Sequence, residues 1–172
     1  MNYYAILNGT EITGVMAADG PFPEGVQLTG PVDWGSKPSA HHKPHLASGS
    51  VVWQDPRSLT EARTEKLRQL RDARETALNS TFTWDGSVFD ADQVSQTRLM
   101  GLCLDAQLPG FTNQAWRLAD NSWRVLNATD AAAVWVALKT HMAAQFTHFA
   151  AKEAAVNAVD TDTPAKVDAI VW

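Results

Sequence analysis

The sequence has very little cysteine, no long hydrophobic run and no excess of positive charge. Its 172 residues include one cysteine, Cys103, which excludes an internal disulfide and a zinc site built from several cysteines. No stretch approaches the roughly 18 consecutive apolar residues of a transmembrane helix, so we expect no membrane insertion. The first four residues, Met-Asn-Tyr-Tyr, lack the basic character of a signal peptide. We therefore expect synthesis in a cytoplasm.

The charge balance argues against a nucleic-acid partner. Fourteen lysines and arginines stand against 19 aspartates and glutamates, which gives a net charge of -5. A protein that coats nucleic acid or an anionic membrane needs a basic surface. The hydrophobic share of 45% and the seven tryptophans are instead typical of a folded protein with a large aromatic content.

Catalytic motifs are also lacking. The sequence contains no nucleophile elbow, no phosphate-binding loop, no dinucleotide fingerprint and no zinc-protease motif. Asp85 belongs to a predicted turn, and Asp90 or Asp92 caps the helix that follows it. Cys103 lies between Leu102 and Leu104, where a buried core thiol is the simpler interpretation. We therefore predict neither an enzyme nor a cofactor.

Histidines offer the one possible metal motif. His41, His42 and His45 occur in the segment His-His-Lys-Pro-His, and imidazole is a common metal ligand. No acidic or cysteine residue lies nearby, and Lys43 would repel a cation. We interpret the segment as a solvated loop. His141 and His148 lie two helical turns apart and are interpreted as the polar border of a helix.

The N-terminal third divides into a hairpin and a linker. Asn8-Gly9-Thr10 separates two apolar runs, which predicts a β-hairpin over residues 1–18. Residues 19–50 hold five prolines and five glycines without a regular period, so they are predicted to be a Pro/Gly-rich linker. Val51-Val52-Trp53 is a possible short strand. The hairpin would then act as a separate attachment module.

Residues 51–172 are predicted to form an α+β body. Ser58 and Glu61 have the spacing of a capping box, which predicts a helix to about Leu78. Its interspersed acidic and basic residues indicate a solvated outer face rather than an RNA-binding one. Two units of hairpin and helix follow. The fold class is therefore α+β, with an N-terminal β-hairpin module and a hairpin-helix-hairpin-helix body whose antiparallel sheet packs on helices.

The two predicted hairpins have two-residue turns, Asp85-Gly86 and Asp120-Asn121. In the first, Phe82, Trp84 and Phe89 would share a core face. In the second, the same turn length places four apolar residues on one face, namely Trp116, Leu118, Trp123 and Val125. One antiparallel sheet could contain both hairpins.

The second turn also places Arg117 opposite Arg124 on the outward face. Like charges opposite each other destabilise an isolated hairpin. Either a carboxylate of this chain covers them, for instance from the helix at residues 61–75, or a partner supplies one. Both arginines are therefore candidate partner-binding residues.

Two further helices are predicted, over residues 92–108 and from an N-cap at Thr129 to about Val159. The first carries apolar residues nearly all round its C-terminal half, which is typical of a helix buried on several sides. The second has an apolar stripe up to Phe149 and alanine rows beyond it. Ala151 and Ala155 could meet a helix of another copy, which predicts a homo-oligomer, or be covered by the helix at residues 61–78.

Two segments resemble an uncharacterised domain of bacteriophage tail-fibre and tail-assembly proteins. One begins Phe-Thr-Trp-Asp-Gly-Ser-Val-Phe-Asp at Phe82, and the other runs Ala-Trp-Arg-Leu-Ala-Asp-Asn-Ser-Trp-Arg-Val from Ala115. The resemblance covers about residues 61–159. It implies a tail component or assembly factor, whose partners are other tail proteins, and brings no catalytic residues.

The function expected from this resemblance is that of a non-enzymatic tail component in the virion, attached to the baseplate or tail fibre and helping to present the receptor-binding apparatus. One alternative is a tail-fibre assembly chaperone that is absent from the mature virion. A weaker alternative is a carbohydrate-binding module that uses exposed tryptophans such as Trp34 and Trp53. The carboxylate pair required for glycoside cleavage cannot be singled out.

Overall fold

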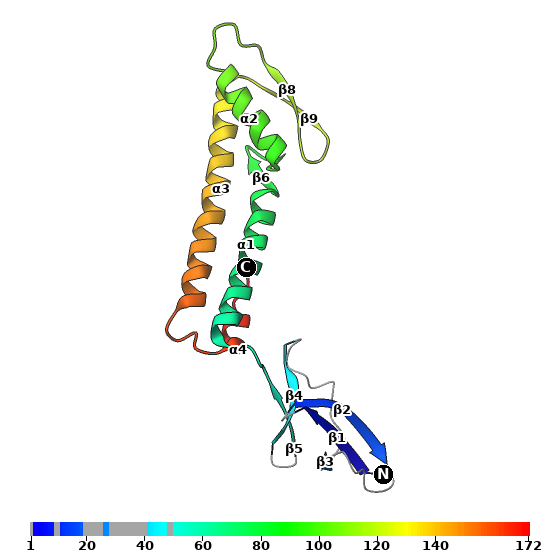
Figure 1. Ribbon diagram of the computed structural model, residues 1–172. Coiled ribbons are helices and arrows are strands. Elements are labelled where there is room, and N and C mark those ends of the chain that lie inside the picture. The colour runs from blue at the N-terminus through cyan, green and yellow to red at the C-terminus, as the bar shows by residue number, and fades with distance from the viewer. Residues whose placement is uncertain (1, 9–10, 19–25, 28–40, 48–49) are drawn as a thin grey trace. The chain divides into compact units, whose positions relative to one another are not determined.

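The chain forms two compact units, residues 1–61 and 62–172 (Figure 1). The computed structural model describes residues 2–8, 11–18, 26–27, 41–47 and 50–172. Antiparallel strand pairs and helices both occur, so the predicted α+β class is confirmed.

The N-terminal unit contains a five-stranded antiparallel sheet in the order β3-β1-β2-β4-β5. The predicted hairpin is present as its two longest strands, which pair from Asn2↔Ala18 to Asn8↔Glu11 with an irregularity after Ile6. The strands are β1 (Asn2–Asn8), β2 (Glu11–Ala18), β3 (Val26–Gln27), β4 (Lys43–Ala47) and β5 (Ser50–Gln54). Ala5 and Ile12 are buried in this unit.

The predicted linker at residues 19–50 and the predicted boundary at residue 51 differ from this arrangement. Residues 26–27 and 43–47 form strands of the same sheet as the hairpin, and the possible strand at Val51-Val52-Trp53 is β5 of that sheet. These strands have two to five residues, and Pro44 lies within β4, so composition alone concealed them. Residues 19–25 and 28–40 lie outside the described residues.

The capping box ahead of α1 (Leu59–Leu78) is confirmed. The Ser58 Oγ accepts a hydrogen bond from the main-chain N–H of Glu61 at 3.2 Å, and the main-chain N–H of Ser58 donates to the Glu61 carboxylate at 2.7 Å. Two donors at the helix start are thereby satisfied. On the outer face of α1, Arg68 and Asp72 form an i,i+4 ion pair at 2.9 Å, and Glu75 pairs with its neighbour Arg74 at 2.6 Å.

The first hairpin of the C-terminal unit follows its prediction. It pairs β6 (Thr81–Trp84) with β7 (Ser87–Asp90), with Trp84 opposite Ser87. Asp85 and Gly86 both have positive φ, 45° and 72°, as a two-residue type I′ turn requires. Phe82 and Phe89 are opposite each other and buried, with ring centroids 5.5 Å apart.

The two long elements of the second half are α2 (Gln93–Asp105) and α3 (Ala128–Asn157). Asp92 caps α2 by accepting from the N–H groups of Val94 and Ser95. The hydroxyl and N–H of Ser95 hold the pKa of Asp92 below its usual value. The predicted cap of α3 at Thr129 is wrong, because Asn127 and Asp130 form a reciprocal capping box two residues earlier.

The core of this unit lies between α2, α3 and the two hairpins. Its buried members are Phe82, Phe89, Ala91, Leu99, Leu102, Leu118, Leu126, Ala131, Val134 and Leu138. The single sheet expected from the sequence does not form, since β6–β7 and β8–β9 are separate two-stranded sheets. The hairpins are joined by a hydrogen bond from the Ala119 N–H to the Val88 oxygen, at 3.0 Å.

Basic residues of α1 bind the far end of α3 and the segment after it, and Figure 1 shows the two helices side by side. The Arg63 guanidinium donates to the main-chain oxygens of Ala158 and Thr161 at 3.3 and 2.9 Å. Arg74 lies over the rings of Phe146 and Phe149, with its Cζ 5.1 and 4.8 Å from their centroids. The basic side of α1 is therefore partly structural.

A second cluster joins α1, α3 and the C-terminal segment. Leu70, Phe149 and Val156 are buried in it, and Ile170 and Trp172 pack against it. The last helix is α4 (Pro164–Asp168), with Pro164 in its first turn. The apolar residues that follow it therefore dock on α1 and α3.

Candidate functional site

The β8–β9 hairpin, between α2 and α3, has a different turn from the predicted one. Its strands are β8 (Gln114–Arg117) and β9 (Trp123–Leu126). The Leu118 N–H donates to the Ser122 oxygen at 2.9 Å, and the Asn121 N–H donates to the Leu118 oxygen at 2.9 Å. Asn121 has a φ of 69°. These features define a three-residue loop, a type I turn followed by a left-handed residue.

Asp120 stabilises this longer loop. Its carboxylate accepts hydrogen bonds from the Ser122 N–H and hydroxyl, at 2.9 and 2.6 Å. The same two bonds lower the pKa of Asp120. An aspartate that bonds two residues ahead is a common turn device, and here it sets the length of the loop.

One extra loop residue shifts the register by one and moves alternate side chains to the other face. Arg117 pairs with Trp123, and Arg124 pairs with Trp116. The predicted core positions of Trp123 and Val125 are therefore wrong, since their exposed fractions are 68% and 61%. Leu126 is fully buried instead. Arg117 and Arg124 consequently lie on opposite faces and do not repel each other across the strands.

Arg124 joins the two hairpins. Its guanidinium donates to the Asp85 main-chain oxygen at 3.0 Å and to the Ser87 hydroxyl at 2.8 Å, and it forms an ion pair with the Asp85 carboxylate. The Cζ of Arg124 also lies 4.5 Å from the ring centroid of Trp84. Of the two alternatives that the sequence left open, Arg124 therefore follows the first, a carboxylate of this chain, although Asp85 supplies it rather than the helix at residues 61–75.

Replacing Arg124 by glutamine should destabilise the protein by about 1–2 kcal/mol, because a cation–π contact and several hydrogen bonds are lost. In a double-mutant cycle with Asp85→Asn, the coupling should be only about 0.2–1 kcal/mol, since Asp85 is largely exposed. Urea denaturation measures both values. Arg117→Gln is the matched control and should cost less than about 0.5 kcal/mol. Equal losses for the two arginine variants would contradict this role of Arg124.

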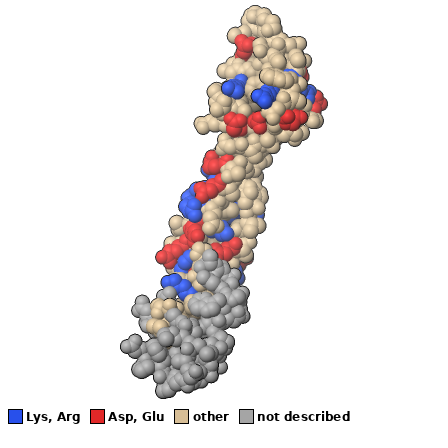
Figure 2. Space-filling model, turned by 90° about the vertical axis from the view of Figure 1, so that its right-hand side faces the viewer, with Lys and Arg blue, Asp and Glu red and all other residues tan. Residues whose placement is uncertain are grey.

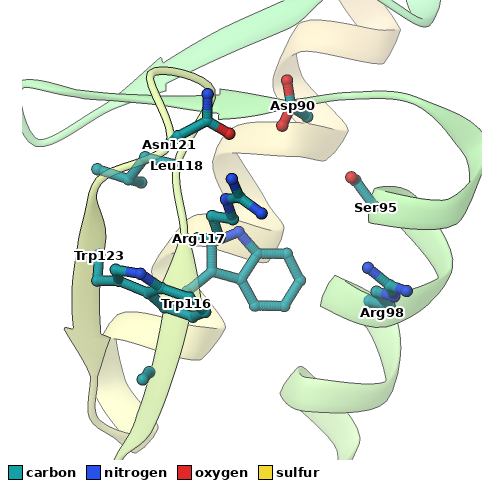
Figure 3. A pocket seen from close by; sticks show the side chains of 9 residues that line it. Asp90, Ser95, Arg98, Trp116, Arg117, Leu118, Asn121 and Trp123 are labelled. Atoms are coloured by element: carbon teal, nitrogen blue, oxygen red, sulfur yellow. The ribbon is translucent and has the colours of Figure 1, made fainter.

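A cleft of about 500 Å³ lies between α2 and the β8–β9 hairpin (Figure 3). Ser95 and Arg98 line it from α2, while the hairpin contributes most of the other side chains. The full lining is Asp90, Ser95, Arg98, Ala115, Trp116, Arg117, Leu118, Asn121 and Trp123. A cleft of this size with a few convergent polar groups is typical of a ligand site.

The sequence interpretation missed this cleft. Arg98 was not singled out, and Trp123 was assigned to the core. A usable signal was the repeated Trp-Arg dipeptide at residues 116–117 and 123–124, on both sides of one turn. Two such dipeptides on paired strands place both residue types on each face of a hairpin.

The outward side of α2 is apolar and exposed, which corrects the prediction of a helix buried on several sides. Only Leu99 and Leu102 of α2 are buried. Four large apolar residues in and just after the helix are exposed by 44–61%, namely Val94, Met100, Leu104 and Leu108. The core contacts one side of α2, so its opposite apolar side has no cover among the described residues.

The remaining histidine and cysteine candidates have structural surroundings. His41 and His42 directly precede β4, and His45 lies within it. The His141 Nε2 is 3.0 Å from the main-chain oxygen of Ala77, and the His148 ring packs edge-on against Trp172. Within the described ranges, no three histidine, cysteine or acidic side chains are grouped so that they could hold a metal ion. Cys103 is half-buried rather than fully enclosed.

The carboxylates considered for chemistry are spread out. Asp85 occupies the type I′ turn, Asp92 is the N-cap of α2, and Asp90 lines the cleft. In the N-terminal unit, the hydrogen bond from Arg57 lowers the pKa of Asp55 to about 2, and their atoms approach to 2.6 Å.

The alanine rows of α3 are partly covered within the chain. The distal turns of α3 pack on α1. Of the two covers considered for the alanine rows, a helix of another copy or the helix at residues 61–78, the structure shows the second. Ala151 is exposed and Ala155 is half-buried. Trp34, one of the tryptophans considered for sugar binding, lies outside the described residues, and Trp53 is half-buried in β5.

Comparison with protein families identifies the larger unit. A family model described as a domain of unknown function (DUF4376) matches residues 61–171. The chain belongs to this family. The match confirms that the segment from residue 61 is an uncharacterised domain, and it extends the predicted end from residue 159 to 171, so that α4 belongs to the DUF4376 domain. No curated protein and no solved structure matches the chain.

The DUF4376 domain therefore contains the cleft, the Arg124 contacts and the apolar side of α2. Figure 2 shows basic and acidic side chains interspersed on the visible face of this domain, without a large patch of one sign. Among the described residues, no helix has the length and apolar character required to cross a membrane.

Proposed function

We propose that this protein is a non-enzymatic component of a bacteriophage tail that binds other tail proteins at the baseplate or fibre. The observation that carries the proposal is the exposed apolar side of α2, formed by Val94, Met100, Leu104 and Leu108. Soluble monomers rarely expose a large continuous apolar patch, and such patches commonly mark protein-protein interfaces. The tail setting rests on the resemblance of the segments that begin at Phe82 and Ala115 to tail-fibre and tail-assembly proteins.

The two-unit organisation supports the same proposal. The N-terminal sheet is a compact unit of its own and would attach the protein to one tail subunit, while α2 of the DUF4376 domain contacts another. A second copy of the chain is a further partner in this proposal, with Ala151 exposed on α3. The location would be the virion tail, after synthesis in the cytoplasm of the bacterial host.

Mass spectrometry of purified virions tests the proposal. We expect the chain at stoichiometric copy number in virions of the phage that encodes it. Its absence from virions, together with binding to immature fibre, would identify an assembly chaperone instead. A chain encoded outside any phage or prophage tail region would contradict both versions.

A charge on the apolar side of α2 should block assembly. Leu104→Glu places a carboxylate at the exposed centre of this side, and we expect its incorporation into virions to fall at least about tenfold, the effect of roughly 1.4 kcal/mol. Thr140→Glu adds the same charge at an exposed position of α3 and should be incorporated like the wild type. Equal incorporation of both variants would exclude this side of α2 as the contact.

A further inference from the structure

The cleft between α2 and the β8–β9 hairpin contains a set of polar groups that the proposed tail contact does not use. Arg98 and Arg117 supply donors only, and the Asp90 carboxylate supplies acceptors only. Ser95 and Asn121 can both donate and accept. Neither arginine side chain has a hydrogen-bond or ion-pair partner among the residues that the structure describes. Their guanidinium groups are therefore available to a ligand.

Two tryptophans give the same cleft an aromatic wall. Trp116 is half-buried and packs against the core, so its position is fixed by the fold. Trp123 is 68% exposed. Figure 3 shows both indoles on the hairpin side, with Arg117 close to Trp116 and with Arg98 across the cleft on α2. Flat apolar faces beside hydrogen-bonding groups suit a ligand that is apolar on one face and polar at its edges.

A sugar ring has this distribution of groups. Its C–H face stacks on an indole, while its hydroxyls donate and accept at the ring edge. Two guanidiniums and one carboxylate leave the cleft with one excess positive charge, in a chain whose net charge is -5. Arginine binds carboxylates through paired, charge-assisted hydrogen bonds. We propose that this cleft binds a saccharide that carries a carboxylate, such as a uronic or sialic acid residue.

Asp90 favours a saccharide over an acidic peptide. An aspartate or glutamate side chain offers no donor to the Asp90 carboxylate and would be repelled by it. A sugar hydroxyl donates to that carboxylate while the sugar's own carboxylate binds an arginine. The lining of the cleft therefore suits a ligand that carries both hydroxyl donors and one acidic group.

A glycan array tests the proposal with the full chain. The array pairs each uronic-acid and sialic-acid glycan with its neutral parent or methyl ester, and it includes a glutamate tripeptide. We expect at least one acidic glycan to bind about tenfold more tightly than its neutral counterpart when the hit is measured by titration calorimetry. An absence of binding to every acidic glycan at about 10 mM would overturn the proposal, as would a tripeptide that binds equally well.

Variants locate the binding in this cleft. Arg98→Gln and Arg117→Gln should bring the affinities for the acidic and neutral forms to within about twofold of each other. Trp123→Ala should weaken both forms alike, because it removes the stacking face and no charge. Arg71→Gln, an exposed arginine on α1, is the matched control and should bind as the wild type does. An acid preference that survives both cleft arginine substitutions, with circular dichroism unchanged, would exclude this site.

Discussion

Replacing Phe89 with alanine should destabilise the DUF4376 domain by about 3–5 kcal/mol. Phe89 is fully buried at the centre of the core, where its ring stacks on Phe82 and meets the edge of Trp84 at a centroid distance of 6.2 Å. Small domains are stable by only about 5–15 kcal/mol, so the variant should lose a large part of its stability. Urea denaturation followed by the circular dichroism of the helices measures the loss.

Val88→Ala is the matched control for this substitution. Val88 is the neighbouring residue of β7 and faces the other way, with an exposed fraction of 41%. Its truncation should cost less than about 1 kcal/mol. If Phe89→Ala and Val88→Ala were equally stable, the inward face of the first hairpin would be incorrectly assigned.

Replacing Leu126 with alanine should cost about 2–5 kcal/mol, whereas Trp123→Ala should cost less than about 1 kcal/mol. The tryptophan, although it is the larger side chain, is expected to contribute less to the free energy of unfolding than the leucine. The reason is the register of the β8–β9 hairpin, which buries Leu126 completely and leaves Trp123 mostly exposed. The register expected from the sequence places Trp123 in the core, where its truncation would instead cost about 3–5 kcal/mol.

Thermal or urea denaturation of these two variants therefore decides the register. A small effect for Leu126→Ala combined with a large effect for Trp123→Ala would restore the two-residue turn. Such a result would also remove the aromatic wall of the cleft, because a buried Trp123 could not line it.

The two hairpins show how far turn residues predict a register. Asp85-Gly86 fixes a two-residue turn because both residues adopt positive φ, and the predicted pairing of Phe82 with Phe89 was correct. At Asp120-Asn121 only Asn121 has positive φ, and the Asp120 carboxylate stabilises a three-residue loop. Asp and Asn are favoured both in two-residue turns and in three-residue loops that end in a left-handed residue, so the dipeptide did not determine the register.

The ends of the helices could be predicted where the capping residues were unambiguous. The burial of individual side chains could not be predicted in the same way. The capping box of Ser58 and Glu61 needed only local sequence. Asn127 and Thr129 were both acceptable caps, and the reciprocal bond with Asp130 favours the first. For α2, the pattern located the helix but could not show which apolar residues meet the core, because that depends on how many elements surround it. Predicting the cleft likewise required knowledge of the register of the β8–β9 hairpin.

The contacts of α1 also bear on the order of folding during synthesis. Arg63 bonds to Ala158 and Thr161, which follow it by 95 and 98 residues along the chain. The hairpins, α2 and the first half of α3 form among near neighbours in sequence, and such local contacts form early. An isolated helix of about 20 residues is only marginally stable in water. On the ribosome, the first half of α1 therefore remains without the contacts of Arg63 until the end of α3 has emerged, although α1 precedes α2 and α3 in the chain.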